Sequence, residues 1–251
     1  MAVTAGTIVA VAAPSLGLQG REVVDAAGAY VMPGAIDAHV HFNVFNPMVD
    51  DFRVHLGGRG LRRRHHHDAV HRRLEGMSVV EGLEHFAAEG ERRSVVDFAM
   101  HCRLRPDAKL IEQIPQSIAY GVTSIKMFQA YKKRGMLFAD DQLLRGMELT
   151  GAHGGIALVH AENGHVIDYL EDKLAREGKT APEFYLSSRP HVAESEAVSR
   201  AIDIAGLAGC PSTWCTSARP TGSSTSRGRG RAARPSTRRR APSTCSHRRW
   251  K

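Results

Sequence analysis

The stretch VMPGAIDAHVHF, residues 31–42, decides the fold. Within it, IDAHVHF predicts a short apolar strand that carries His39 and His41 two positions apart. Side chains at that spacing lie on the same face of a strand, so both imidazoles can approach one metal ion. Histidine is the commonest ligand of zinc-type ions, but an HxH pair alone is more often two half-buried strand residues. Support for a metal site at His39 and His41 must therefore come from the rest of the chain.

Strand and helix patterns alternate after this stretch. Three apolar segments predict buried strands: SVVDFAMHCRL (94–104), TSIKMFQAY (123–131) and GIALVHAEN (155–163). Five segments have helical periodicity: 78–91, 107–120, 140–153, 164–178 and 192–209. Near the N-terminus, GTIVAVAA (6–13) and REVVDAAGAYVMPG (21–34) predict short strands of a small sheet. Such strand–helix alternation implies parallel strands in an α/β layer architecture.

The composition indicates an ordinary globular protein, with 42% hydrophobic residues. Its four cysteines form no CxxC motif and no paired pattern, which favours a reducing compartment: Cys102, Cys210, Cys215 and Cys245. The N-terminus lacks the basic segment of a signal peptide, and no apolar run is long enough to cross a membrane. We therefore expect a cytoplasmic protein with no membrane partner.

The positive charge is confined to two segments. Residues 211–251 carry ten Arg and one Lys without any Asp or Glu, and residues 53–73 carry seven Arg against Asp68 alone. Subtracting these charges of +11 and +6 from the net charge of +8 leaves −9 for the remaining chain. The body is acidic, so the net charge does not indicate a specific nucleic-acid partner. The tail has almost no apolar residues, and we expect it to be disordered.

Four blocks of the sequence closely resemble the amidohydrolase superfamily, in particular its cyclic-amidase branch of dihydropyrimidinases, hydantoinases, allantoinases and dihydroorotases. VMPGAIDAHVHF is similar to the first barrel strand of that family. The other blocks follow in the family's order: GVTSIKMFQAYK (121–132), HAENGHVIDYL (160–170) and KTAPEFYLSSRPHVAESEAVSRAI (179–202). The AENG sequence and the last block favour the hydantoinase and dihydropyrimidinase group over dihydroorotase. The resemblance covers most of residues 1–52 and 74–211.

The resemblance implies a binuclear metal site. By matching position, His39 and His41 would bind the first divalent metal, and His160 the second. Lys126, carboxylated by CO2, would bridge both ions, and Tyr131 would hydrogen-bond the substrate and stabilise the developing oxyanion. Two ions can share one hydroxide and polarise the amide carbonyl that it attacks. Zinc is the family default, although manganese, iron or cobalt also suit such ligands.

Structural interpretations of these residues remain open at this point. Lys126 could be an ordinary strand-end lysine, and Tyr131 a packing tyrosine with its hydroxyl at the surface. Glu162 and Asn163 are expected to orient the loop or the ligands rather than to bind metal. The histidines outside the motifs are interpreted as structural or solvent-facing: His85, His101 and His153.

The implied fold is an incomplete (β/α)8 barrel of the TIM type beside a small β-sandwich segment. We assign residues 1–31 to the small β domain, 32–210 to the partial barrel and 211–251 to the disordered basic tail. Barrel strands one, three, four and five can be recognised in the sequence. Strand two is replaced by the anomalous segment, strand six is not recognisable, and the chain ends before strands seven and eight. A complete barrel of this kind takes about 250 residues.

The anomalous segment at 53–73 can be explained by a shifted reading frame. We infer a set of codons for residues 61–67, CTA CGG CGG CGT CAC CAC CAT, because a protein sequence does not fix its codons. Read one base later and into the Asp68 codon, this set gives Tyr-Gly-Gly-Val-Thr-Thr-Met, which resembles the missing second strand. Likewise, a set of codons inferred for the chain from Cys210 onward gives Pro-Leu-Tyr-Val-Val-His-Val-Ser in another frame, which resembles the sixth strand. We therefore interpret the triplet His65, His66 and His67 as shifted threonine codons and not as a metal site.

The function implied by the resemblance is metal-dependent hydrolysis of a cyclic amide C–N bond in a small dihydropyrimidine, hydantoin or ureide ring. The family uses a second histidine on strand six and an aspartate on strand eight, which this chain lacks, so we expect it to be inactive. Alternatives are an allantoinase-like or dihydroorotase-like hydrolase, or a non-catalytic scaffold, against which the four retained ligands argue. Relatives are commonly homotetramers. An arginine tail would bind nucleic acid only non-specifically.

Overall fold

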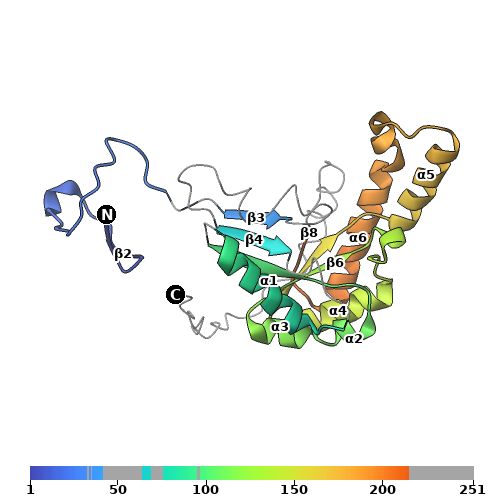
Figure 1. The fold of residues 1–251 in the computed structure, drawn as a ribbon, viewed down its shortest axis with the longest axis horizontal. Coiled ribbons are helices and arrows are strands. Elements are labelled where there is room, and N and C mark those ends of the chain that lie inside the picture. The colour runs from blue at the N-terminus through green and yellow to red at the C-terminus, as the bar shows by residue number, and fades with distance from the viewer. Residues whose placement is uncertain (33, 35, 42–63, 69–75, 95–96, 215–251) are drawn as a thin grey trace. The chain divides into compact units, whose positions relative to one another are not determined.

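The computed structural model describes residues 1–32, 34, 36–41, 64–68, 76–94 and 97–214 (Figure 1). They fall into two compact units, Met1–Gly34 and Ala35–Lys251. Most of the anomalous segment 53–73 and almost all of the basic tail lie outside the described residues, including the histidine side chains of the triplet.

The N-terminal unit contains one small antiparallel ribbon. Strands β1 (Ala2–Thr4) and β2 (Thr7–Ala10) pair across a two-residue turn, and a 3-10 helix η1 (Pro14–Leu16) follows. The turn residues Ala5 and Gly6 have φ values of 48° and 77°, the left-handed conformation that a tight hairpin requires. The expected strand over 21–34 is wrong for the described residues, because the chain turns at Ala27 and Gly28 instead. Apolar side chains of this unit, such as Ile8 and Val9, are exposed.

The second unit is built on a parallel sheet of six described strands. They are β3 (Ile36–Val40), β4 (Arg64–Asp68), β5 (Phe98–Arg103), β6 (Ser124–Phe128), β7 (Ile156–His160) and β8 (Ser212–Trp214). Their order in the sheet is their order in the chain, and each pairs in parallel with the next. Consecutive parallel pairing with intervening helices is the arrangement of a (β/α)8 barrel, so the predicted α/β class and partial barrel agree with the structure.

Strands two and six differ from the expectation. β4 lies between β3 and β5 although its sequence belongs to the anomalous segment, and β8 continues the sheet beyond β7. The physical reason is that strands pair through their backbone N–H and C=O groups. A segment that lies next to an unpaired strand edge can therefore join the sheet whatever most of its side chains are. β8 has only three residues, and these belong to the segment 211–251 that we expected to be disordered.

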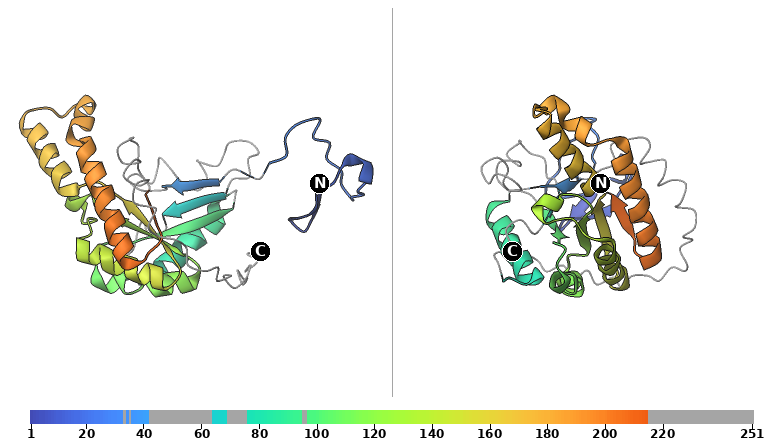
Figure 2. Two further views of the ribbon diagram at one scale, coloured as in Figure 1. Left: turned by 180° about the vertical axis from the view of Figure 1, so that it is seen from behind. Right: turned by 90° about the vertical axis from the view of Figure 1, so that its right-hand side faces the viewer.

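The helices lie on one side of the curved sheet (Figures 1 and 2). They are α1 (Val79–Arg93), α2 (Ala108–Ile111), α3 (Ile114–Tyr120), α4 (Asp140–Ala152), α5 (Gly164–Arg176) and α6 (His191–Ala208), with 3-10 helices η2 (Lys132–Arg134) and η3 (Pro182–Ser188). The single helix expected over 107–120 is broken in two, because Pro115 in the first turn of α3 has no N–H to donate to a continuous helix. No helix in the described ranges has the length and apolar character needed to cross a membrane.

Local signals in the sequence explain where these helices begin and end. Ser78 and Glu81 form a capping box at the start of α1, with the Ser78 N–H donating to Glu81 Oε2 at 2.7 Å and the Glu81 N–H donating to Ser78 Oγ at 3.2 Å. Asp107 caps α2 in a similar way. Gly121 ends α3 and Gly209 ends α6, both with positive φ.

The hydrophobic core lies between the sheet and the helices. Alternate residues of β6 and β7 supply it: Ile125, Met127, Ala157 and Val159, all fully buried. Helices α1, α3 and α4 cover them with Leu83, Ile114, Leu143 and Met147, also fully buried. Because side chains alternate along a strand, Lys126, Phe128 and His160 face the opposite side of the sheet, away from these helices.

Candidate metal and active site

The predicted site residues lie at or near the carboxyl ends of three parallel strands. His39 is on β3 and His41 directly follows it, Lys126 is on β6, and His160 is the last residue of β7. Tyr131 follows β6 by three residues. The register pairs Phe128 with His160, so the ends of β6 and β7 are level. In barrel folds this edge of the sheet carries the functional groups.

His39 and His41 approach each other as the strand pattern predicts. Their Nε2 atoms are 2.9 Å apart, and the ring centroids are 4.8 Å apart with the planes at 62°. Two histidine nitrogens bound to one tetrahedral zinc, at about 2.0–2.1 Å each, would be separated by roughly 3.3 Å. The pair therefore presents two ligand nitrogens at close to the separation that one ion requires.

Lys126 is buried, with 1% of its surface exposed. Its Nζ lies 5.2 Å from the centroid of the Phe128 ring, and among the described residues it has no hydrogen-bond or ion-pair partner. A buried ammonium group without an anionic partner is costly. The surroundings of Lys126 therefore fit an anionic carbamate formed from its amine better than a charged ammonium group.

Three aromatic rings form a cluster at the ends of β6 and β7. The Tyr131 ring centroid is 5.0 Å from that of His160 and 5.9 Å from that of Phe128, and the Phe128 and His160 centroids are 5.7 Å apart. The structure therefore brings Tyr131, His160 and, through the Phe128 ring, Lys126 into one neighbourhood.

Tyr131 has an unusual backbone conformation, with φ 62° and ψ 43°. A non-glycine residue in this left-handed region costs of order 1–3 kcal/mol and is enriched at functional sites. The Tyr131 carbonyl accepts hydrogen bonds from the backbone N–H groups of Arg134 at 3.0 Å and Met136 at 3.2 Å, which hold the turn.

The surroundings of Tyr131 keep its hydroxyl protonated. Burial, followed by the negative charge of Glu162, raises the pKa of the Tyr131 phenol, while Arg189 and Arg134 act in the opposite direction. A phenol with a raised pKa remains a hydrogen-bond donor throughout the neutral range. It can therefore donate to an oxygen atom on which negative charge develops.

His160 contacts Glu162, two residues along the same loop. His160 Nε2 lies 2.7 Å from Glu162 Oε2, and the two side chains are 12% and 20% exposed. The hydrogen bond from His160 lowers the pKa of Glu162, with a smaller contribution from the charge of Arg189. Asn163 caps α5, accepting from the Val166 N–H at 3.1 Å, so the expectation that it orients the loop agrees with the structure.

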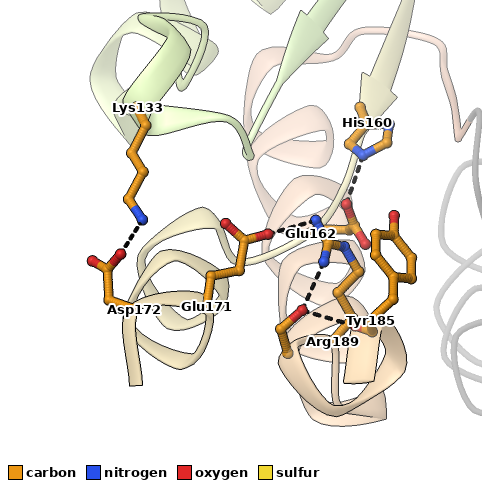
Figure 3. Close-up of polar contacts among 8 residues, drawn as sticks. Lys133, His160, Glu162, Glu171, Asp172, Tyr185 and Arg189 are labelled. Carbon is orange, nitrogen blue, oxygen red and sulfur yellow. Dashed lines mark hydrogen bonds and ion pairs between the residues drawn. The ribbon is translucent and has the colours of Figure 1, made fainter. Parts of the chain in front are cut away.

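Arg189 is a residue that the sequence analysis missed (Figure 3). Its guanidinium group donates to Glu171 Oε1 at 2.8 Å and to Ser188 Oγ at 2.7 Å, and it lies 4.1 Å from the centroid of the Tyr185 ring. Arg189 stands in the block SSRP, residues 187–190, but no pattern in the sequence relates this block to the loop after β7. Lys133 and Asp172 form a separate ion pair nearby.

His101 is structural, as expected, and its role is specific. The ring is 7% exposed, with Nδ1 at 2.6 Å from Ser124 Oγ on β6 and Nε2 at 3.0 Å from the Ala38 carbonyl oxygen on β3. It therefore joins the strand that carries His39 to the strand that carries Lys126. The other two histidines, His85 and His153, are exposed.

The described side chains form two groups of candidate ligands: His39 with His41, which contact each other, and Lys126 with His160, which both lie near the Phe128 ring. Within the described ranges, no group of three or more His, Cys, Asp or Glu side chains is placed to hold a metal ion.

Comparisons with known proteins agree with the sequence pattern. No family model matches the chain. Among curated proteins, it is 35% identical over 196 residues to a D-hydantoinase of Ralstonia pickettii, covering 76% of this chain and 42% of that protein. It is 34% identical over 208 residues to an allantoinase of Bacillus velezensis (80% and 45%), and 32% identical over 200 residues to a dihydropyrimidinase of Rattus norvegicus (77% and 38%). The chain thus spans less than half the length of these relatives.

Solved structures give the same result. A D-hydantoinase from a Bacillus species superimposes with a TM-score of 0.76 at 29% identity, over 84% of this chain and 47% of that one. A dihydropyrimidinase from Brevibacillus agri superimposes with a TM-score of 0.75 at 27% identity, over the same shares. The chain is thus similar to hydantoinases and dihydropyrimidinases in sequence and in fold, and it belongs to their family, the cyclic amidohydrolases.

Proposed function

We propose that the protein to which these residues belong hydrolyses the C–N bond of a small cyclic amide, of the dihydropyrimidine or hydantoin type, with the help of two divalent metal ions. The observation that carries this proposal is the convergence of the His39 and His41 Nε2 atoms, 2.9 Å apart, in the same parallel sheet as Lys126, a buried lysine without a counter-ion in the described residues. The similarity to enzymes named for such rings supports the substrate class.

In this proposal the ligands divide between the two ions. His39 and His41 would hold the first ion, and His160 would hold the second. Lys126, converted to an anionic carbamate by the addition of CO2 with loss of a proton, would be a ligand of both ions. The ions, zinc in the first instance, would supply an activated hydroxide and a polarised carbonyl. The buried position of Lys126 supports this role, since a carbamate shared by two cations removes the cost of an isolated buried charge.

Tyr131 is proposed to bind the substrate. Its protonated phenol would donate a hydrogen bond to the amide carbonyl oxygen of the substrate, on which negative charge develops. Removing one such donor typically lowers turnover by about 10²–10³-fold.

The second histidine and the aspartate that the family resemblance requires have no counterpart in the described strands. β8 contains Ser212, Thr213 and Trp214, and the first histidine after it in the chain is His247. We therefore propose that a polypeptide of these 251 residues alone does not turn over substrate, because it lacks a metal ligand and a general base, and general-base catalysis alone is worth about 10²–10⁴ in rate. Purified protein with added zinc should show no hydrolysis of dihydrouracil or hydantoin, and robust turnover would contradict this.

To test the family activity, the nucleotide sequence from codon 50 to beyond codon 251 is determined first. The protein encoded by the restored reading frame is then assayed. We expect the shifted frames to encode the second and sixth strands, and the restored protein to open dihydrouracil or hydantoin. Allantoin belongs in the same assay, because an allantoinase is among the relatives. A restored protein that binds zinc but opens none of the three rings would favour the scaffold alternative. DNA that encodes the printed residues without any such frame would refute the frame-shift hypothesis.

A further inference from the structure

We propose that Lys133 and Asp172 are positioning residues, whose ion pair holds the turn that carries Tyr131 against α5 and so keeps the Tyr131 ring beside His160 and Phe128. The inference rests on the proposed function, in which Tyr131 binds the substrate. The position of the ring can nevertheless be measured without any metal or substrate.

The turn from Tyr131 to Gly135 is strained and needs contacts that hold it. Tyr131 has φ 62° and ψ 43°. A residue other than glycine keeps this left-handed conformation only where the surrounding structure enforces it. Within the turn, the Tyr131 carbonyl accepts from the N–H groups of Arg134 and Met136 at 3.0 and 3.2 Å. These bonds fix the shape of the turn, but they do not fix where the turn lies relative to β7, which carries His160.

Two contacts with α5 bracket Tyr131 in the chain. Two residues before it, the Gln129 carbonyl accepts from the Gly164 N–H at 3.0 Å. Two residues after it, Lys133 Nζ contacts Asp172 Oδ1, and Figure 3 shows the Lys133 side chain extending from the turn to α5. Gly164 and Asp172 are eight residues apart on α5, which is about 12 Å along a helix. Because the two contacts are this far apart, the turn cannot pivot about the first one alone.

The charges on the two sides of this contact are complementary. The turn has three consecutive basic residues, 132–134, and α5 carries Asp168 and Asp172 one helical turn apart on the same side. The pKa of Lys133 is raised, chiefly by its hydrogen bond with Asp172 and also by the negative charges of Asp172, Asp168 and Glu171. Lys133 therefore keeps its positive charge throughout the neutral range.

The position of the turn determines where the Tyr131 ring lies. Its centroid is 5.0 Å from that of His160 and 5.9 Å from that of Phe128, and both of these residues belong to strands of the sheet. The Lys133 and Asp172 side chains are 49% and 53% exposed, and an ion pair this exposed adds little to the stability of a whole fold. We therefore expect loss of the pair to move the ring and to leave the sheet folded.

NMR of the full chain can follow the Tyr131 ring. The chain has five tyrosines, so few signals overlap in a sample labelled with ¹³C-tyrosine, and Tyr131→Phe identifies the Tyr131 signals. The neighbouring rings of Phe128 and His160 shift these signals away from those of a tyrosine in an unfolded chain. We expect smaller shifts in Asp172→Asn, where the attraction is lost, and the smallest in Asp172→Lys, where repulsion replaces it.

Charge reversal and a matched control complete the experiment. Lys133→Glu combined with Asp172→Lys restores a pair of opposite charges, and we expect it to restore most of the Tyr131 shifts. Glu112→Gln breaks an ion pair of similar exposure, 49% and 54%, which joins the end of α2 to Arg145 of α4. This control should leave the Tyr131 shifts unchanged. Circular dichroism verifies that each variant is folded.

The outcomes separate this inference from the proposed function. Unchanged Tyr131 shifts in both Asp172 variants would overturn the positioning role, as would an equal change in Glu112→Gln or a reversed pair that restores nothing. The role of Tyr131 in binding is tested on its own, in the protein encoded by the restored reading frame. Full hydrolysis by its Tyr131→Phe variant would contradict that role, whatever the spectra show about the ion pair.

Discussion

At the scale of single residues, His101 shows how one buried polar side chain can hold two parts of a site together. Both ring nitrogens contact oxygen atoms on other strands, Ser124 Oγ and the Ala38 carbonyl. Because β3 carries His39 and β6 carries Lys126, a shift of either strand would change the distance between the two groups of candidate ligands. The sequence suggests a structural role for His101, but the two partners are 63 and 23 positions away in the chain and no local pattern relates them.

Replacement of His101 by Phe should therefore destabilise the fold. The change removes the ring contacts to the Ala38 carbonyl and to the Ser124 hydroxyl, which keeps only its longer hydrogen bond to the Met100 carbonyl at 3.5 Å, and the expected loss in free energy of unfolding is about 1–3 kcal/mol. Urea denaturation followed by circular dichroism measures it. His153→Phe is the control, because that ring is exposed, and its effect should stay within about 0.5 kcal/mol. Equal losses in both variants would contradict the bridging role.

Cys102 should be unreactive at any physiological pH. The side chain is fully buried, and desolvation raises the pKa of its thiol to about 12. The thiolate is the nucleophile, and it is almost absent below that pH. Native protein treated with iodoacetamide at pH 8 and digested should show no modified Cys102, whereas protein denatured in urea should show full modification. Modification of Cys102 in the native state would mean that α3 and β5 separate far more readily than this packing implies.

The residue-level comparison shows what a sequence can and cannot reveal about a site. The proximity of His39 and His41 follows from strand alternation alone. Glu162 was expected to orient the loop or the ligands, and its contact with His160, two residues away, agrees with that expectation. The position of Arg189 depends instead on how the segment before α6 packs, which is a property of the tertiary structure. Residues related by period or motif were therefore predicted, and residues related only through packing were not.

At the scale of elements, glycines mark where helices approach strands most closely. Gly164 begins α5 against the chain after β6, and an added Cβ would lie 2.9 Å from Ala130 Cα and 3.0 Å from the Gln129 carbonyl oxygen. These neighbours are backbone atoms, so they cannot move aside cheaply. Gly82, in contrast, lies in α1 with no atom within 4 Å of its added Cβ.

The two alanine substitutions should have opposite signs. Gly164→Ala should lower the free energy of unfolding by about 1–3 kcal/mol because it overpacks a rigid contact. Gly82→Ala should raise it by about 0.5–1 kcal/mol, since alanine restricts the unfolded chain and favours a helix interior. Thermal and urea denaturation of the pair would measure both values. A stabilising Gly164→Ala would show that α5 does not dock as closely as described.

Most elements of the second unit could be predicted because their apolar periodicity is strong. The strands β5, β6 and β7 and the helices α4 and α5 fall within the predicted segments, and α1 and α6 differ from theirs by one or two residues at one end. The break between α2 and α3 at Pro115 was missed because the apolar pattern continues through it. β4 was missed because its sequence has no strand pattern. It forms a strand only through backbone pairing with β3 and β5.

At the scale of the whole molecule, the sheet of described strands has two edge strands. Of the described strands, β3 and β8 each have one neighbour, so each leaves one row of backbone groups without a strand partner in that set. Such edges favour pairing with other chains. Sedimentation velocity at a series of concentrations, in buffer with enough salt to screen the arginines, should show association that increases with concentration. A monomer at all concentrations would indicate that both edges are covered.

The order of the strands also governs how the molecule can form. Each strand pairs with the one synthesised just before it, so the sheet can be extended one strand at a time while the ribosome is still adding residues. Neighbours that are close in the chain meet quickly, because short loops cost little entropy to close. Under vectorial synthesis, the histidine pair would emerge first, the lysine second and the His160 loop third, so the growing nascent chain would gain its candidate ligands one strand at a time.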